Sequence, residues 1–357
     1  MSFACMTILR TPYHMHADGE AASHIDILTM RSAAHERDLI SGVVVHTSMA
    51  SRPIKGTFAH TYSIVAVDRQ AGIMGAAVQS HWFSVGSVVP WARPGAGVVA
   101  TQSFTDPAYG PRGLDLMADG VLPSEALASL VAEDDGRDVR QVAMVDIKGN
   151  AAAHTGAGCI AEAGHITGEG FSVQANMMLH PTVPAAMAAA FRETEGRLAE
   201  RMLAALAAAE AEGGDIRGRQ SACLLVVRMA STGRPWEDRL TDLRVDDSAD
   251  PLVELARLLK VQRAYEHMDA GDVALARGDH AKALMEYSSA ESLYPENEEI
   301  VYWTAVGLAN SGRVDESLPR FRQVFERNEN WRELTSRLFD KGQITVDGED
   351  LKRILSV

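Results

Sequence analysis

The stretch that decides the fold is His60-Thr61-Tyr62-Ser63-Ile64-Val65-Ala66-Val67-Asp68. From Tyr62 onward its residues are aromatic, β-branched or small, which is typical of a buried strand. The run that follows, Asp68-Arg69-Gln70-Ala71-Gly72, supplies a turn, and residues 73–79 have the character of a second strand. The sequence therefore predicts a β-hairpin whose first strand begins with a threonine.

A threonine at the start of a buried strand has two interpretations. Its hydroxyl is a nucleophile when a base lies beside it, and the α-amine of an N-terminal threonine can be that base, with an unperturbed pKa near ~8. Because His60 precedes Thr61, this chemistry requires cleavage of the His60–Thr61 bond, by the chain itself or by another protease. The simpler interpretation is that Thr61 is a β-branched residue that opens a strand.

Further motifs follow the hairpin in a fixed order. They are Gln79–Gly86, Val89–Arg93, Ala100–Gln102, Tyr109–Leu114, Ala153–Gly156, Gln174–Met177 and Gly213–Ser221. With these motifs, residues 61–268 resemble the Ntn-hydrolase-like (N-terminal-nucleophile hydrolase-like) family catalogued as domain of unknown function 1028. The resemblance implies an αββα sandwich and the chemistry of an amidohydrolase, but no particular substrate.

The predicted order of elements in the α+β domain, residues 60–250, agrees with two stacked sheets covered by helices. After the hairpin, the pattern predicts strands and helices in alternating groups. Strands are expected at 98–102, 141–146, 151–155, 171–175, 221–228 and 240–245, and helices at 112–119, 124–132, 182–195 and 198–212.

Composition indicates a soluble, cytoplasmic protein, and no cofactor is expected. The 357 residues include 34 basic and 48 acidic side chains, a net charge of −14, which disfavours binding to nucleic acid or to an anionic membrane. The three cysteines, Cys5, Cys159 and Cys223, are too widely spaced for a disulfide framework or a zinc site. No apolar run approaches the ~18 residues of a membrane span. We expect a homo-oligomer, with a dimer favoured.

Residues 1–59 differ from the rest and are expected to be a poorly ordered leader or an over-extended gene start. With His60, the first sixty residues hold six of the twelve histidines and four later methionines that could each be the true start. His14, His16, His24 and His35 suggest a metal site, but they lack acidic or cysteine partners at ligand spacing. We expect them to be solvated, with no metal bound, and the leader to make few contacts with the core.

The C-terminal region is predicted to be helical, with a connecting helix at 251–268 and a tetratricopeptide-like domain at 269–357. A repeat of period 34 relates Gly278 to Gly312, Leu284 to Leu318 and Tyr287 to Phe321. We expect the members of each pair to occupy equivalent buried positions. Such repeats usually hold a peptide or a second subunit, so a protein partner is expected here. The alternatives are two units that only brace the preceding domain and a plain amphipathic helical tail.

The candidate catalytic residues are Thr61 as nucleophile, Asn176, His81 and Arg93. Asn176 ends an apolar strand and is a candidate donor to the developing oxyanion, the alternative being an asparagine that satisfies turn backbone. His81 is a candidate to orient substrate or tune the amine, or a structural residue beside Trp82. Threonine-nucleophile relatives use a lysine to lower the pKa of the amine, and none occurs between Thr61 and Ile147, so Arg93 would have to serve.

The candidate substrate-binding residues are polar side chains near strand ends: Ser80, Gln102, His154, Gln174 and Arg219. An arginine such as Arg219 binds a carboxylate with two hydrogen bonds. We expect Thr61 to be partly accessible in a cleft lined by some of His81, Gln102, Asn176 and Arg219.

Two functions remain open. The first is an N-terminal-nucleophile amidohydrolase that acts on a small amide or peptide-like substrate. The second is a non-catalytic binding or scaffold protein that keeps the fold, while its helical repeats mediate assembly. The motif order that begins at Thr61 favours the first, and the missing lysine favours the second.

Overall fold

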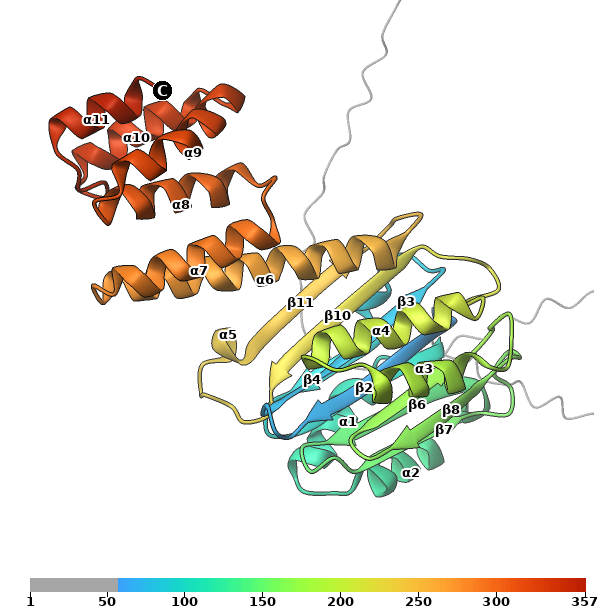
Figure 1. Ribbon diagram of the computed structural model, residues 1–357. Coiled ribbons are helices and arrows are strands. Elements are labelled where there is room, and N and C mark those ends of the chain that lie inside the picture. Colours follow the sequence, from blue (N-terminus) through green and yellow to red (C-terminus); the bar gives the residue numbers. More distant parts are fainter. Residues whose placement is uncertain (1–56) are drawn as a thin grey trace, which may run out of the picture. The chain divides into compact units, whose positions relative to one another are not determined.

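The structure is a computed structural model, and it describes residues 57–357 (Figure 1). The expectations for residues 1–56, including the order of the leader and its histidines, lie outside the described residues. The first element, β1 (Thr57–Ala59), falls within the predicted leader yet pairs with a strand of the core. The last residues assigned to the leader are therefore part of a sheet.

Six antiparallel strands form one sheet, in the order β11-β10-β3-β2-β9-β8. Its central pair, β2 and β3, is the predicted hairpin, with Thr61 opposite Ser80. The strands are β2 (Thr61–Asp68), β3 (Ile73–Ser80), β8 (Gly164–Gly168), β9 (Phe171–Ala175), β10 (Ser221–Arg228) and β11 (Arg239–Val245).

The second sheet has the path β1-β5-β6-β7, and it is also antiparallel. β1 and β4 share one edge of β5, because β6 occupies the other edge. The strands are β4 (Pro90–Arg93), β5 (Gly97–Thr105), β6 (Arg140–Asp146) and β7 (Ala151–Thr155). The edge of β5 is therefore covered by two short strands rather than by one long strand.

Helices cover the outer face of each sheet (Figure 1). α1 (Tyr109–Ala118) and α2 (Pro123–Glu133) pack on the second sheet, while α3 (Val183–Glu193) and α4 (Leu198–Ala211) pack on the first. A separate apolar cluster, rich in valine and alanine, fills the space between the sheets. The predicted arrangement of two antiparallel sheets with helices is confirmed.

The side chains of β2 alternate between two buried faces. Tyr62 and Ile64 lie in the core beneath the helices, whereas Val65 and Val67 lie in the core between the sheets. Thr61 shares the face of Val65, because the side chains of a strand repeat every two residues. The polar start of β2 therefore faces the opposite sheet, where it must find hydrogen-bond partners.

The predicted all-helical C-terminal region is confirmed. It comprises α6 (Pro251–Ala276), α7 (His280–Leu293), α8 (Glu298–Asn310), α9 (Val314–Arg327), α10 (Asn330–Asp340) and α11 (Gly348–Leu355). Leu255 and Leu259 of α6 pack in the core over the first sheet, whereas Ala264 and Met268 pack in the core shared with α7. One uninterrupted helix thus joins the sandwich to the tail.

Positions 34 residues apart are equivalent in the tail. Tyr287 and Phe321 are both buried, as predicted. Gly278 and Gly312 are instead exposed, at φ +76° and +75°, because each follows the end of a helix in a left-handed turn that favours glycine. The expectation that these glycines are buried is wrong, although their equivalence holds. Leu284 and Leu318 are likewise equivalent, but they are half-buried rather than buried.

Tyr287 is the side chain on which the first helix pair depends. Its ring lies against Gly271 and Gly307, where a Cβ would come within 2.4 and 2.7 Å of ring atoms, and its hydroxyl donates to Asp272 Oδ1 at 2.7 Å. We expect Tyr287→Ala to lower the free energy of unfolding of the tail by about 3–5 kcal/mol. Hydrogen exchange should then increase in α6–α8 but not in β2 and β3.

The matched control is Met285→Ala on the same helix, where the side chain is 59% exposed. It should change the stability of the tail by less than about 0.5 kcal/mol. A loss of protection in β2 and β3 together with the tail would contradict the division into two cores.

Candidate functional site

Thr61 begins β2 and is completely buried. Its Oγ1 donates to the carbonyl oxygen of Ala59 at 2.7 Å. The expectation that Thr61 is partly accessible is therefore wrong for the uncut chain, in which the two preceding residues are buried as well: Ala59 is fully buried and His60 is 2% exposed.

The carbonyl oxygen of Thr61 is held by donors from both sheets. It accepts from the backbone N–H of Asn176 at 3.1 Å, from Asn176 Nδ2 at 3.3 Å and from Gln102 Nε2 at 3.1 Å. Asn176 directly follows β9 and Gln102 lies on β5. Two of the residues expected near Thr61, Gln102 and Asn176, thus contact it through its backbone.

These donors belong to a buried polar network between the sheets, which we call the amide seam: Ser63, Gln102, Gln141, Gln174 and Asn176. Gln174 Nε2 donates to Ser63 Oγ, and Ser63 Oγ donates to Gln102 Oε1, both at 2.6 Å. Gln141 Oε1 accepts from Gln102 Nε2 at 2.7 Å and from Asn176 Nδ2 at 2.8 Å. In a low-dielectric interior such bonds strengthen one another and fix the side chains.

The carbonyl oxygen of His60, on the bond that precedes Thr61, is held by two other donors. Ser80 Oγ donates to it at 2.6 Å and Arg217 Nη2 at 2.8 Å. Arg217 is aligned by Asp215, through Nε to Oδ1 at 3.0 Å and Nη2 to Oδ2 at 2.7 Å. A hydroxyl and a guanidinium on one peptide oxygen polarise the His60–Thr61 carbonyl, as donors to an oxyanion do.

The imidazole of His60 is also fixed. Its Nδ1 lies 2.8 Å from Asn176 Oδ1, and its ring meets Phe104 edge-on at a centroid distance of 6.3 Å. Burial is the largest influence on the pKa of His60 and lowers it from 6.5. The neutral ring therefore donates from Nδ1 to the Asn176 amide oxygen.

The expected substrate-binding residues Ser80 and Gln174 lie at the site, whereas His81 and Arg219 lie at its rim. The His81 backbone N–H donates to Asp215 Oδ2 at 3.3 Å, and its Nδ1 lies 3.2 Å from the Arg219 carbonyl. The Arg219 guanidinium pairs with Glu210 and Asp250. Both side chains thus bind partners other than Thr61, at the periphery of the site.

Arg93 and His154 do not converge on Thr61. Arg93 is opposite Gly97 at the start of β5, five residues before Gln102 and so about 17 Å away along the strand, where it pairs with Asp115. His154 neighbours Thr155, whose Oγ1 binds Gln141 of the amide seam, so alternation turns His154 to the other face, where it contacts the Arg137 carbonyl at 2.8 Å. Their proposed roles at the nucleophile are not supported by these positions.

Five residues of the site were not among the sequence candidates: His60, Ser63, Gln141, Asp215 and Arg217. Arg217 lies within the motif Gly213–Ser221, in which Arg219 was the arginine singled out. Gln141 follows Arg140 at the start of β6 and precedes the apolar residues 142–145, so it is a polar residue near a strand end, as Ser80 is. That pattern was the available signal.

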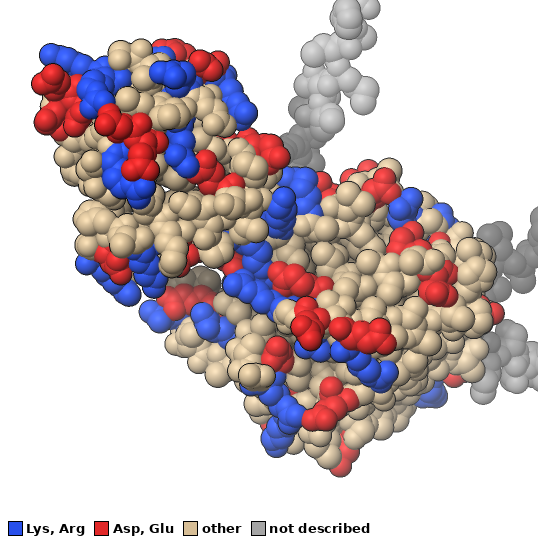
Figure 2. Space-filling model, in the orientation of Figure 1, with Lys and Arg blue, Asp and Glu red and all other residues tan. Residues whose placement is uncertain are grey.

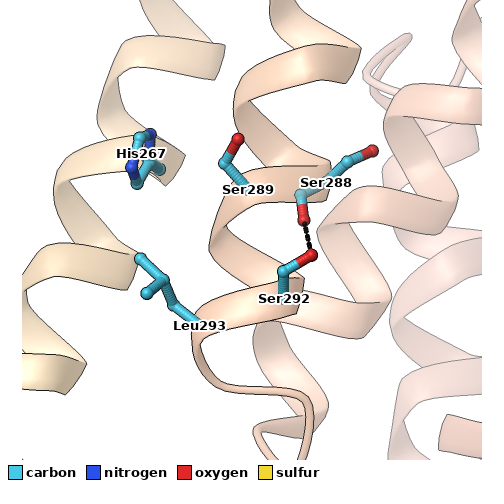
Figure 3. A pocket seen from close by; sticks show the side chains of 5 residues that line it. All are labelled: His267, Ser288, Ser289, Ser292 and Leu293. Carbon is cyan, nitrogen blue, oxygen red and sulfur yellow. Dashed lines mark hydrogen bonds between the residues drawn. The ribbon is translucent and has the colours of Figure 1, made fainter.

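A hollow of about 430 Å³ lies on the tail, far along the chain from Thr61. It is lined by His267, Ser288, Ser289, Ser292 and Leu293, and Figure 3 shows His267 facing the serines of the neighbouring helix. His267 Nδ1 contacts Glu286 Oε2 at 2.7 Å, and Ser292 Oγ donates to Ser288 O at 2.8 Å. Its lining therefore combines one histidine, three serines and one leucine.

Charges of both signs are interspersed on the face in Figure 2. Many form local pairs, such as Arg263 with Glu200 and Arg320 with Glu291. None of the described helices is long and apolar enough to cross a membrane.

Two facing antiparallel sheets covered by helices, with a polar seam at the head of a central strand, define the class of this domain. The sequence of residues 61–255 matches the model of a family of unknown function, DUF1028, and the chain belongs to that family. A crystal structure of the protein SPO2555 from Silicibacter pomeroyi, also assigned to DUF1028, is 32% identical. The match covers 57% of this chain and 85% of that chain, with a TM-score of 0.52. No curated protein matches the chain.

The hydrogen bonds of the amide seam lead us to expect a measurable contribution to stability. Gln141→Leu removes the acceptor of Gln102 Nε2 and Asn176 Nδ2. Both amides still reach the Thr61 carbonyl, but each loses one of its acceptors. Because an unsatisfied buried N–H costs about 1–3 kcal/mol, the variant should lose about 2–5 kcal/mol, measured by chemical denaturation. Gln70→Leu, on the exposed turn after β2, is the matched control and should stay within about 0.5 kcal/mol of the parent. Equal stability of both variants would show that the seam contributes little.

Proposed function

We propose that this protein is an amidohydrolase of the N-terminal-nucleophile type, with Thr61 as its nucleophile and a small amide or peptide-like substrate. The observation that carries the proposal is the His60 carbonyl, which accepts from Ser80 Oγ and Arg217 Nη2 beside the Thr61 hydroxyl. The layer order, which is that of an αββα sandwich, and the DUF1028 membership support it.

The nucleophile is freed by self-cleavage at His60–Thr61. Thr61 Oγ1 turns from the Ala59 carbonyl and adds to the His60 carbonyl carbon, closing a five-membered ring, while Ser80 and Arg217 hold the oxyanion. The Oγ1 proton passes to the Thr61 nitrogen, the C–N bond breaks, and an ester remains. Water hydrolyses the ester to the His60 carboxylate and restores the hydroxyl of Thr61, which now has a free amine.

The free amine then acts as the base for Thr61 Oγ1 in substrate turnover. Arg217 supplies a positive charge near this amine, which disfavours its protonated form and lowers its pKa, the role that the missing lysine has in other threonine nucleophiles. Asp215 moderates this effect and holds the guanidinium in place. Asn176 and Gln102 bind the Thr61 carbonyl and so position the residue rather than the oxyanion.

The second candidate, a non-catalytic scaffold, is favoured by the state of the uncut chain. Thr61 is fully buried and its hydroxyl is bound to Ala59, so the chain presents no nucleophile until it is cut. In this case the tetratricopeptide-like tail carries the function, and the hollow at His267 is its contact with a protein partner. The two candidates differ in whether the chain is cleaved.

Intact mass and N-terminal sequencing of purified protein test the proposal. We expect a fragment that begins at Thr61 and ends at Val357, whichever methionine starts translation. Thr61→Ala should remain uncut, and Arg217→Met should cleave about a hundredfold more slowly, the usual effect of losing an oxyanion donor. Arg234→Met, an exposed arginine paired with Glu237, is the control and should cleave like the parent. A folded parent chain that stays uncut would favour the scaffold.

A further inference from the structure

We propose that β1 occupies the place of the substrate, and that the edge of β5 binds the acyl part of an extended peptide. The inference rests on the proposed function, because it assigns the scissile carbonyl of that peptide to the position of the His60 carbonyl. The substrate class is then a peptidyl amide rather than a small free amide.

The first support is the pairing of β1. Thr57, Phe58 and Ala59 lie opposite Thr105, Phe104 and Ser103, antiparallel to β5. β4 covers the same edge only from Gly97 to Ala100, so β1 alone covers its other end. If β1 left, the backbone N–H and C=O groups at this end of β5 would be unpaired on one side. Such an open strand edge is a template for an extended chain.

The second support is that the residues before Thr61 occupy formed sites. Ala59 is fully buried in the core between the sheets, so this position accepts a small side chain. The His60 ring binds Asn176 Oδ1 and packs on Phe104, so the next position accepts a side chain with a hydrogen-bond donor. The following carbonyl is received by Ser80 and Arg217.

The backbone of β5 adds a third observation. Ser103, opposite Ala59, has φ +70°, in the left-handed region that is unfavourable for a residue other than glycine. Such strain costs about 1–3 kcal/mol, and it is retained where surrounding contacts impose it, often at binding sites. Here it lies at the point where β5 turns from β4 toward β1 as its partner.

The test separates peptide binding from cleavage. In the full chain, Thr61→Ala prevents self-cleavage, and Ala59→Arg displaces β1, because arginine has no room at this fully buried position. We expect amides of residues 103–105 to exchange faster in this double variant. The peptide acetyl-Thr-Phe-Ala-His-amide should then slow their exchange by roughly tenfold at about ten times its Kd. If Ala59→Arg prevents folding, Ala59→Pro replaces it, because proline removes an amide of β1.

Three control peptides define the recognition. The reversed sequence His-Ala-Phe-Thr should not protect residues 103–105, and replacing alanine by leucine should abolish protection, because the Ala59 site is closed. Replacing histidine by alanine should weaken binding by about tenfold, the effect of one lost hydrogen bond. Absence of protection, or equal protection by all four peptides, would overturn the inference.

Failure of this inference differs from failure of the proposed function. If the chain cleaves itself and hydrolyses amides, the proposed function stands. If the double variant nevertheless fails to bind the peptide at residues 103–105, the inference about β5 is wrong. Specific protection by the peptide without any cleavage at Thr61 keeps the β5 edge as a peptide site and removes the hydrolase.

Discussion

The structure depends on one constraint: the peptide unit between His60 and Thr61 is buried between two sheets, and both flanking carbonyls must be hydrogen-bonded there. The His60 oxygen takes its donors from Ser80 and Arg217, and the Thr61 oxygen takes its donors from Asn176 and Gln102. Leaving one such group unsatisfied costs about 1–3 kcal/mol. Because the donors come from β3, β5, the end of β9 and the 213–221 loop, satisfying this short stretch of backbone ties these segments to one another.

The amide seam also fixes the register of the strands, which the apolar core alone does not. The cluster between the sheets is made largely of valine and alanine, whose similar shapes would tolerate a slip of two residues along a strand. Such a slip would carry Ser63 away from Gln102 and Gln174, and Gln141 away from its two donors, and would leave several buried amides unpaired. Packing therefore stabilises the sandwich, while the polar seam selects one alignment of it.

The sequence predicts those features that depend on local pattern. The β2–β3 hairpin follows from its β-branched runs and turn, and Ser80, Gln102 and Asn176 were found because they are polar residues at or near strand ends. The assignment of Arg93 failed because a sequence identifies a strand end but not which end of the sheet it reaches. His154 failed for a related reason: the pairing of β7 with β6 decides which of its alternating side chains face the seam, and the sequence does not show that pairing. β1 has no local signal in three residues; it is a strand because the edge of β5 needs a partner.

The same donors that bury the His60–Thr61 bond make the site receptive once that bond is cut. While the chain is intact, Ser80 and Arg217 are satisfied by the His60 carbonyl, and the His60 ring satisfies Asn176 Oδ1. Departure of the leader would remove the His60 carbonyl. Asp215 would still align Arg217, and the amide seam would still align Asn176. Groups held in place without a partner favour a ligand that restores the lost bonds, because they need little reorganisation to bind it. The strand that closes the site therefore also specifies the geometry of what can replace it.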